Sequence, residues 1–289
     1  MRMSSFQKHF FVIVNYNSGH HIISTIQSIF SSKNITPNII IVDNHSTDNS
    51  LEYCKTKFPH ITYISCKKNV GFASGANIGM RYACKNNAET ITLINPDATI
   101  DPYCMHHIFQ KIQKIGPSIA SPIIFNDETK SEIWFSGGKI HSICMRATHK
   151  SPKNTLLEIL PKNSFISGCV MTISRKIIDE IGFFDEQFFL YYEDVDLSLR
   201  AQKKNFTLCV VKNAYAYHKE LSENMPQTKI YHLVLSGALF FSKHASIIQK
   251  PYFATHIFLR KIKNYYDRKR HAPFSKTVHK ALNDLKKHL

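Results

Sequence analysis

The chain lacks a long apolar run. Its N-terminal run, Phe10–Val14, has five residues, and the longest later stretch, Leu233–Phe241, is interrupted by Ser236 and Gly237. A membrane-spanning helix needs about 20 consecutive apolar residues. We therefore expect neither a secretory signal peptide nor a membrane span.

Cysteine pairs are also missing. The seven cysteines are scattered, odd in number and form no Cys-x-x-Cys pair. Neither a zinc knuckle nor a disulfide framework is indicated, and a reducing cytosol suits this usage. The sequence contains no repeats and no low-complexity tract.

Acidic residues are few: 21 Asp and Glu stand against 37 Lys and Arg, a net charge of +16. Such a surface attracts phosphates, nucleic acid or anionic lipid headgroups, and charge alone does not choose among them. Residues 260–289 hold ten Lys or Arg and two Asp, which is +8 and half of the total. The excess positive charge is therefore concentrated in the C-terminal segment.

What the chain does contain is a repeated strand-then-helix pattern. Four short β-branched runs are each followed by apolar residues at helical spacing, at residues 10–14 and 22–30, 38–42 and 49–58, 61–65 and 73–85, and 90–94 and 103–115. This order predicts an α/β fold with a Rossmann-like, mostly parallel central sheet flanked by helices.

The pattern changes along the chain. Further strands are expected at 119–125, 165–173 and 206–211, and the sequence after residue 225 becomes helical and basic. We predict a catalytic domain over residues 1–225, with a nucleotide-sugar-binding half at about 9–117 and an acceptor-side half at about 118–225. Residues 226–289 are predicted to form a basic helical C-terminal extension.

Polar residues follow each of the first four predicted strands. They are Asn15, Asn17, Asp43, Asn69, Gly71, Asn95 and Asp97. Ligands of such sheets bind at the carboxyl ends of the strands, so these residues are candidates for a binding site.

Asp43 and Asp97 are the candidate carboxylates of that edge. Asp43 can accept the N3 hydrogen of uracil or thymine, or it can be part of an ordinary helix cap. The turn Asn95-Pro96-Asp97 presents an oxygen ligand suited to Mg²⁺ or Mn²⁺, although such tripeptides also form purely structural turns.

The segment 69–79 is rich in glycine but has no G-x-G-x-x-G fingerprint. Close helix packing explains Gly75 and Gly79. Gly71 is the more probable position beside a ligand.

Glu193, Asp194 and Asp196 begin an amphipathic helix in the sequence FFDEQFFLYYEDVDLSLR. The helix dipole favours ionised carboxylates in the first turn, which suits a general base, although simple capping is the alternative. Asp196 is spaced for an ion pair with Arg200. His218 could return to the site as a metal ligand.

Five ordered motifs, VIVNYNS, IIIVDNHSTD, NVGFASGANIG, LINPDA and GFFDEQFFLYYEDVDLSLR, resemble glycosyltransferase family 2 over residues 9–220. The similarity is greatest to its bacterial rhamnosyltransferase-like branch.

The resemblance implies a GT-A fold and an inverting, metal-assisted transfer with Mg²⁺ or Mn²⁺. It places Asp43 at the nucleotide base, Asp97 at the metal and diphosphate, Asp194 as catalytic base and Glu193 beside it. The other nucleotide-sugar contacts are Asn15, Asn17, Asn69, Gly71, Asn77 and Asn95. Asn95 stands where the usual Asp-x-Asp motif has its first carboxylate, and His218 resembles a metal-side histidine of relatives.

The expected function is transfer from a nucleotide-diphosphate sugar, dTDP-L-rhamnose first, to a lipid-linked saccharide in bacterial surface polysaccharide synthesis. A UDP-hexose or UDP-hexosamine donor is the alternative, and a non-catalytic polyanion- or sugar-binding protein is the alternative from another class. No nucleic-acid partner is expected.

The C-terminal segment interleaves basic with apolar residues, as in helices that lie on anionic membranes. The basic residues are Arg260, Lys261, Lys263, Arg268, Lys269 and Arg270. We expect a cytoplasmic protein peripheral to the inner face of the membrane, although a solvated basic surface gives the same pattern.

Overall fold

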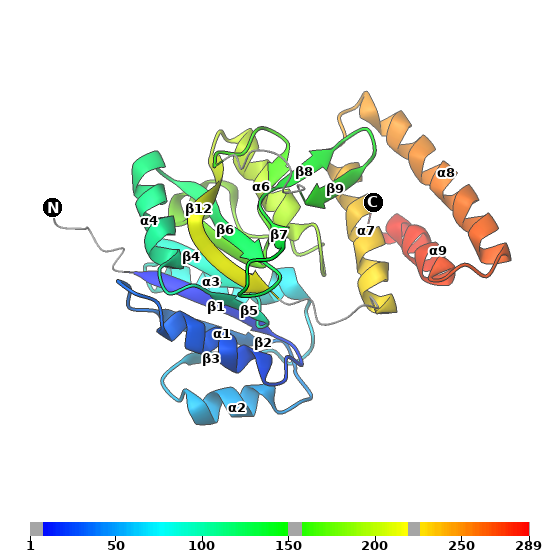
Figure 1. Cartoon of the computed structure of the whole chain (residues 1–289). Helices are drawn as coiled ribbons and strands as arrows, with labels where there is room; N and C mark the ends of the chain where they lie inside the picture. The colour runs from blue at the N-terminus through cyan, green and yellow to red at the C-terminus, as the bar shows by residue number, and fades with distance from the viewer. Residues whose placement is uncertain (1–7, 150–157, 219–225, 289) are drawn as a thin grey trace.

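The computed structural model describes residues 8–149, 158–218 and 226–288. Its centre is a nine-stranded sheet in the order β3-β2-β1-β4-β11-β6-β12-β5, with β7 paired to β6 (Figure 1). Helices flank this sheet, and three C-terminal helices form a group at one side of it. The α/β prediction is confirmed.

The first half of the chain forms the predicted strand-helix units. The strands are β1 (His9–Asn15), β2 (Asn38–Asp43), β3 (Thr62–Ser65) and β4 (Thr90–Ile94), and the helices are α1 (His21–Phe30), α2 (Ser50–Lys57), α3 (Phe72–Lys85) and α4 (Cys104–Ile115). The four strands are parallel to one another. Parallel strands covered on both faces read as continuous apolar runs, which is why these strands were recognisable in the sequence.

The second half makes the sheet mixed. Its strands are β5 (Ala98–Ile100), β6 (Ser118–Phe125), β7 (Ile133–Phe135), β11 (Val170–Ser174) and β12 (Thr207–His218). β11 runs antiparallel between β4 and β6, and β5 is antiparallel to β12. The parallel arrangement thus holds for strands β1 to β4 but not for the whole sheet.

Several elements differ from the sequence prediction. A small second sheet is built from β8 (Gly138–His141), β9 (Arg146–His149) and β10 (Ser164–Phe165), and it was not predicted because its strands are short. β12 continues well beyond residue 211, past an irregularity between Val211 and Tyr215. This extension pairs His218 with Ala98, and so brings the histidine beside the turn that contains Asp97.

Two helices lie between β11 and β12: α5 (Arg175–Ile181) and α6 (Glu193–Lys203).

In the first half of the chain, α3 packs closely on the sheet through its glycines. A Cβ at Gly75 would lie 3.0 Å from Val14, and one at Gly79 would clash with Val12. The packing interpretation of these two glycines is confirmed.

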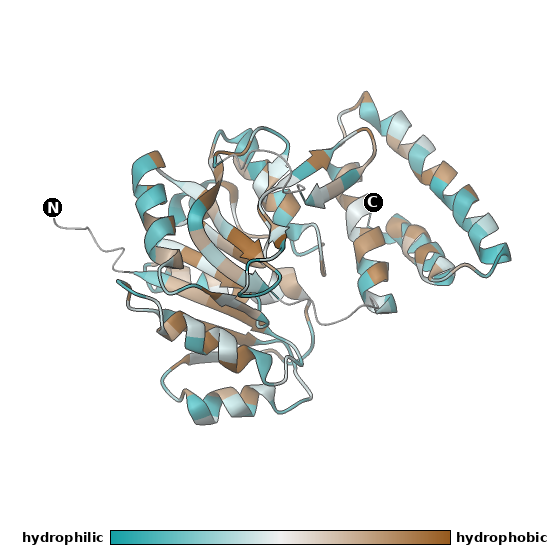
Figure 2. Ribbon diagram, viewed as in Figure 1, coloured by the Kyte–Doolittle hydropathy of each residue, from teal (hydrophilic) through white to brown (hydrophobic). Residues whose placement is uncertain are grey.

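The C-terminal segment is helical, as predicted. It contains α7 (Gln227–His244), α8 (Gln249–Lys269), α9 (Ser275–Asp284) and a short 3₁₀ helix (Leu285–Lys287). Figure 2 shows hydrophobic residues along α7 and many hydrophilic ones on α8. Across the described ranges, no helix combines the length and the hydrophobicity that spanning a membrane requires.

α7 packs against the catalytic part rather than standing apart from it. Residues 234–241 are buried, and Ser236 Oγ donates a hydrogen bond of 2.8 Å to the Leu190 carbonyl. The predicted boundary at residue 225 falls within 219–225, outside the described residues. We propose that α7 belongs to the catalytic domain and that the extension begins at α8.

Candidate active site

Asp43 lies at the end of β2 in a network of hydrogen bonds. Its Oδ1 accepts from Asn15 Nδ2 at 2.8 Å, and its Oδ2 accepts from the Ser46 backbone N–H at 3.2 Å. A carboxylate has about four acceptor sites, so Asp43 keeps capacity for a further donor. The carboxylate is almost fully buried and held in one orientation.

Asn15 and Asn17 support this edge of the sheet from within. Asn15 is fully buried and donates to Asp43 and to Ser50 Oγ at 2.9 Å. Asn17 Oδ1 accepts from the Thr47 backbone N–H at 2.7 Å and orders the loop after Asp43. Asn15 therefore positions Asp43, and its predicted contact with a nucleotide stays a prediction.

Gly71 and Asn77 are also engaged within the protein. Gly71 has φ +85°, and a Cβ there would clash with the Phe189 carbonyl, so packing alone requires the glycine. Asn77 is buried; it donates to the Phe184 carbonyl at 2.9 Å and accepts from the Phe184 N–H at 3.0 Å. Both residues hold the 184–189 segment on α3, and their predicted ligand contacts stay predictions.

Asn69 has a similar local role, because its Oδ1 accepts from Asn44 Nδ2 and from the Gly71 N–H, both at 2.9 Å. Asn95 follows β4, and its backbone N–H donates to the Cys169 carbonyl at 2.9 Å. This bond joins the Asp97 turn to the loop before β11.

Asp97 and His218 face each other, with His218 Nε2 3.3 Å from Asp97 Oδ1. Burial tends to raise the pKa of Asp97, but contact with His218 and the charges of His218 and Lys229 hold it below its usual range. Asp97 is thus favoured in the ionised form in which a carboxylate binds a cation or pairs with a base.

The spacing of Asp97 and His218 suits two ligands of one divalent cation. Adjacent ligands of an octahedral ion with bonds of about 2.1 Å lie about 3 Å apart, close to the separation of these two donor atoms. His218 Nδ1 is buried with no hydrogen-bond partner among the described residues. The described ranges contain no cluster of three or more His, Cys, Asp or Glu suited to a metal. The pair therefore fits a cation that takes its remaining ligands from substrate or water.

Asp194 lies in the first turn of α6 and is held by backbone donors. Its Oδ2 accepts from the Gly168 N–H at 2.9 Å, and its Oδ1 accepts from the Val195 N–H at 2.8 Å. Burial raises the pKa of Asp194, while these hydrogen bonds oppose the shift.

Glu193 is buried, and its Oε2 has no hydrogen-bond partner within the described residues. Burial first, and then the charge of Asp194, raise the pKa of Glu193 well above its usual value. The expectation that the helix dipole keeps both acids ionised is therefore corrected. Desolvation outweighs the dipole at both acids and raises the pKa of Glu193 more strongly, while two backbone N–H groups stabilise the charge of Asp194.

Asp97 and Asp194 lie around one loop, which contains Gly168 and Cys169. The Gly168 N–H donates to Asp194. The carbonyl of the next residue, Cys169, accepts from the Asn95 N–H. Burial and then the charges of Asp97 and Asp194 raise the pKa of the Cys169 thiol. Asp97, at the end of a parallel strand, and Asp194, at a helix start, are thus brought together although they are far apart in sequence.

Asp196 stabilises the helix rather than facing the site. Its fully buried carboxylate accepts from Arg200 Nε at 2.7 Å, and from Lys243 Nζ and His244 Nε2 at 2.8 Å each. The predicted ion pair with Arg200 is confirmed, and α7 adds two partners that the sequence did not indicate.

Other residues of the site were not found from the sequence. Gly168 supplies only a backbone N–H, and no side-chain pattern marks it. Trp134 packs on His218 with ring centroids 4.7 Å apart. The positive charge of Lys229 lowers the pKa of Asp97. The single tryptophan was a signal that could have been used.

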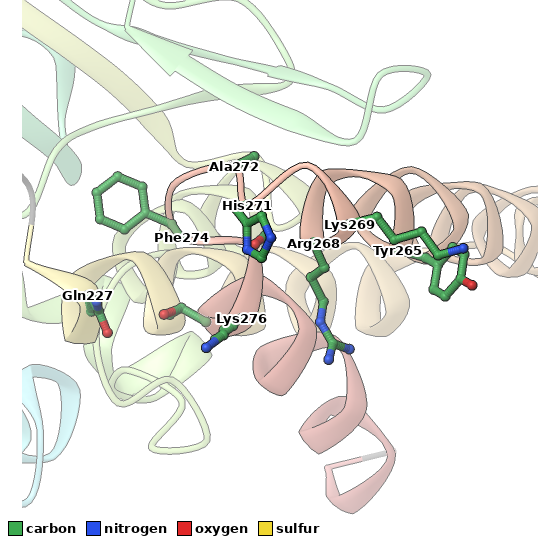
Figure 3. A pocket seen from close by; sticks show the side chains of 10 residues that line it. Gln227, Tyr265, Arg268, Lys269, His271, Ala272, Phe274 and Lys276 are labelled. Carbon is green, nitrogen blue, oxygen red and sulfur yellow. The ribbon is translucent and has the colours of Figure 1, made fainter.

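A separate cationic cavity of about 560 Å³ lies where α8 and α9 meet the start of α7 (Figure 3). Its lining includes Arg268, Lys269, His271 and Lys276, with Tyr265 and Phe274. None of the predicted catalytic residues lines it. The cavity instead belongs to the basic C-terminal segment.

The fold and these paired acids define a class of protein. The central sheet, with the parallel strands β1 to β4 at one side, is the GT-A fold of solved glycosyltransferases. A solved mannosyltransferase from Pyrobaculum calidifontis, described in complex with GDP-Man and Mn²⁺, superposes on the chain with a TM-score of 0.61. The match is 11% identical and covers 97% of this chain and 75% of that one.

Sequence comparison gives the family. The family described as "Glycosyl transferase family 2" matches residues 10–182, and the chain belongs to it.

Two curated relatives cover most of the chain. The low-salt glycan biosynthesis hexosyltransferase Agl10 of Haloferax volcanii is 26% identical and covers 83% of this chain and 76% of its own. The N-acetylglucosaminyl-diphospho-decaprenol L-rhamnosyltransferase of Mycobacterium tuberculosis is 22% identical and covers 72% of this chain and 74% of its own.

Proposed function

We propose that the chain transfers a sugar from a nucleoside-diphosphate donor to a saccharide hydroxyl with inversion at the anomeric carbon. The observation that carries this proposal is the pairing of Asp97 with Asp194 around the Gly168–Cys169 loop. One carboxylate is available for the leaving diphosphate and the other for the incoming hydroxyl.

Asp194 is proposed as the base. The acceptor hydroxyl attacks the anomeric carbon, Asp194 takes its proton, and the nucleoside diphosphate leaves from the opposite face. The N–H groups of Gly168 and Val195 orient the carboxylate, and burial raises the pKa of the neighbouring Glu193, which favours its neutral form beside Asp194. A positioned base of this kind contributes roughly 10²–10⁴-fold to the rate.

Asp97 and His218 are proposed to hold a divalent cation, Mn²⁺ or Mg²⁺. Such a cation neutralises charge that develops on the leaving diphosphate. Their donor atoms lie 3.3 Å apart, and the Pyrobaculum mannosyltransferase is described with Mn²⁺.

The preferred donor is dTDP-L-rhamnose. Asp43 can accept the N3 hydrogen of thymine, and the mycobacterial relative is an L-rhamnosyltransferase. A UDP-hexose or UDP-hexosamine is the alternative, because uracil has the same N3 edge and the Haloferax relative is a hexosyltransferase.

We also propose an acceptor saccharide on a lipid diphosphate, used in bacterial surface polysaccharide synthesis at the inner face of the cytoplasmic membrane. The mycobacterial relative is named for a diphospho-decaprenol acceptor. On α8, exposed Phe258, Leu259 and Tyr266 alternate with the basic residues. This combination suits peripheral contact with an anionic surface.

A panel of nucleotide sugars tests the proposed function. Thermal unfolding is measured with dTDP-rhamnose, UDP-glucose, UDP-N-acetylglucosamine and GDP-mannose, each with Mn²⁺ and with EDTA, and donor hydrolysis is then followed for any that bind. We expect one thymidine or uridine donor to stabilise the protein and to be hydrolysed only with metal. No binding by any donor would support a non-catalytic polyanion- or sugar-binding protein, and full hydrolysis in EDTA would contradict the metal assignment.

A further inference from the structure

A groove of about 850 Å³ lies between α7, α8 and the loop that joins β8 to β9. One part of its lining is apolar and comes from both helices: Leu233, Phe241, Phe253 and Ile257. Leu233 is exposed, whereas Phe241 and Phe253 are buried at its base. The groove therefore offers an apolar wall that can cover a hydrocarbon chain.

The rest of the groove is cationic. Arg146 from β9, and Arg260 and Lys263 from α8, line it, and no acidic residue of the described chain does so. Arg260 is partly buried, and burial lowers its pKa, with only the Tyr192 phenol opposing. A guanidinium removed from water without a carboxylate partner favours an anionic ligand.

The groove adjoins the start of the helix that carries the proposed catalytic acids. Tyr192 lines it and directly precedes Glu193 and Asp194 at the start of α6. Gly237 of α7 leaves room for the Tyr192 ring, since a Cβ there would lie only 3.1 Å from it.

We propose that this groove binds the prenyl diphosphate part of a lipid-linked acceptor. The cations contact the diphosphate, the apolar wall contacts the first isoprene units, and the sugar on the diphosphate extends past Tyr192 to Asp194. This inference rests on the proposed transferase function, and it adds the place and chemistry of acceptor binding.

The two parts of the groove act together on such a ligand. Arginine forms bidentate, charge-assisted hydrogen bonds with phosphate oxygens. Burying apolar surface contributes about 25 cal/mol per Å². Neither inorganic diphosphate nor a neutral prenyl alcohol uses both parts, so each binds less tightly than a prenyl diphosphate.

Farnesyl diphosphate is the probe for a binding test on the whole protein, by calorimetry, with inorganic diphosphate and farnesol as comparison ligands. Arg260→Gln is expected to weaken farnesyl diphosphate binding about tenfold. The matched control is Arg268→Gln on the same helix, which removes the same charge outside the groove and is expected to leave binding unchanged. Lys263→Gln, at an exposed position in the groove, provides a second variant with an expected loss of about threefold.

Several outcomes would overturn the inference. Farnesyl diphosphate that binds no better than inorganic diphosphate would remove the role of the apolar wall, and equal losses in the Arg260 and Arg268 variants would indicate a general basic surface. Binding to anionic phospholipid vesicles is measured with the same variants. If Arg260→Gln weakens vesicle binding more than it weakens farnesyl diphosphate binding, the groove is a headgroup site instead.

Donor hydrolysis separates this inference from the proposed function because hydrolysis needs no acceptor. Donor hydrolysis without farnesyl diphosphate binding would contradict only the groove assignment. Farnesyl diphosphate binding without hydrolysis of any donor would contradict only the transferase function.

Discussion

Glu193 and Asp194 are neighbours in the chain with different surroundings, and this difference separates their proposed tasks. Asp194 accepts two backbone N–H groups, whereas Glu193 Oε2 has no partner among the described residues. A carboxyl buried without donors favours its neutral form. The charge of the pair therefore concentrates on Asp194, the side chain placed to take a proton.

This description predicts how stability depends on pH. The folded-state pKa of Glu193 is raised, so its contribution to stability is fully present below its unfolded pKa and is lost as pH rises through the folded value. Glu193→Gln removes this loss. Between pH 5 and pH 8 the variant should gain stability relative to the wild type, by up to about 1.4 kcal/mol per pH unit.

Urea unfolding at both pH values measures the effect. Glu180→Gln, at an exposed position on α5, is the matched control and should follow the wild type. Parallel pH dependence in the wild type and the Glu193 variant would show that Glu193 is ionised in the folded protein.

The residues that the sequence identified are those whose chemistry is local. Asp43, Asp97 and Asp194 follow a strand or begin a helix, and such places are visible as a change in residue pattern. The partners of these acids are not visible in this way. Gly168 contributes a backbone N–H and Asn77 bonds to the backbone of a distant loop, so only the folded chain distinguishes a ligand group from a structural one.

At the scale of elements, helices α6 and α7 are joined by a buried charge cluster. Asp196 is inaccessible to solvent and contacts Arg200 on its own helix and Lys243 and His244 on α7. Burial would raise its pKa, but His244, Arg200 and Lys243 together hold it well below its usual range. The cluster fixes α7 against the helix that carries Asp194.

Breaking the cluster should therefore destabilise the protein. Asp196→Asn leaves buried cations without their partner, and we expect a loss of about 3 kcal/mol in the free energy of unfolding. The matched control is Asp179→Asn, which breaks the exposed pair with Arg175 on α5 and should cost less than about 1 kcal/mol.

Denaturant titration checks both values, and equal losses in the two variants would contradict the role of the cluster.

The sign of the pH dependence of stability follows from the lowered pKa of Asp196. The contribution of Asp196 is present above its unfolded pKa of about 3.9, and it is lost as pH falls through the folded value.

The order of elements was easier to predict than their pairing. The parallel strands β1, β2 and β4 are buried on both faces, and all four parallel strands alternate with helices, so their sequence is distinctive. β5, β7 and the small sheet with β8 consist of two to four residues each, and long-range pairing rather than local preference forms them. The extension of β12 to His218 likewise depends on its partners β6 and β5.

At the scale of the whole molecule, positive charge and exposed apolar side chains gather on the C-terminal helices. Phe258, Leu259 and Tyr266 are more than half exposed on α8, at 62%, 57% and 55%. The cationic cavity of Figure 3 lies at the end of the same helix. We expect this side of the molecule to face an anionic membrane.

Combined replacement of Lys261, Arg268, Lys269 and Arg270 by glutamine tests this expectation. Each basic residue near the surface is worth about 1 kcal/mol, so binding to phosphatidylglycerol vesicles should fall roughly a hundredfold or more. Substitution is preferred to deletion because α9 contacts α7, with Tyr231 donating a hydrogen bond to Asp284.

Vesicle co-sedimentation gives the result. The control removes four exposed lysines of the catalytic half, Lys55, Lys57, Lys67 and Lys68, and should bind almost as the wild type does. An equal loss in both variants would indicate that the net charge of the protein, and not this face, attracts the membrane.

The central claim is that Asp194 is the base of a sugar transfer, and its most direct test is the single-turnover rate of Asp194→Asn with the donor found in the nucleotide-sugar panel and with Mn²⁺ present. We expect a rate roughly 10²–10⁴-fold below that of the wild type with donor affinity unchanged. A variant that transfers its sugar at the wild-type rate would contradict it.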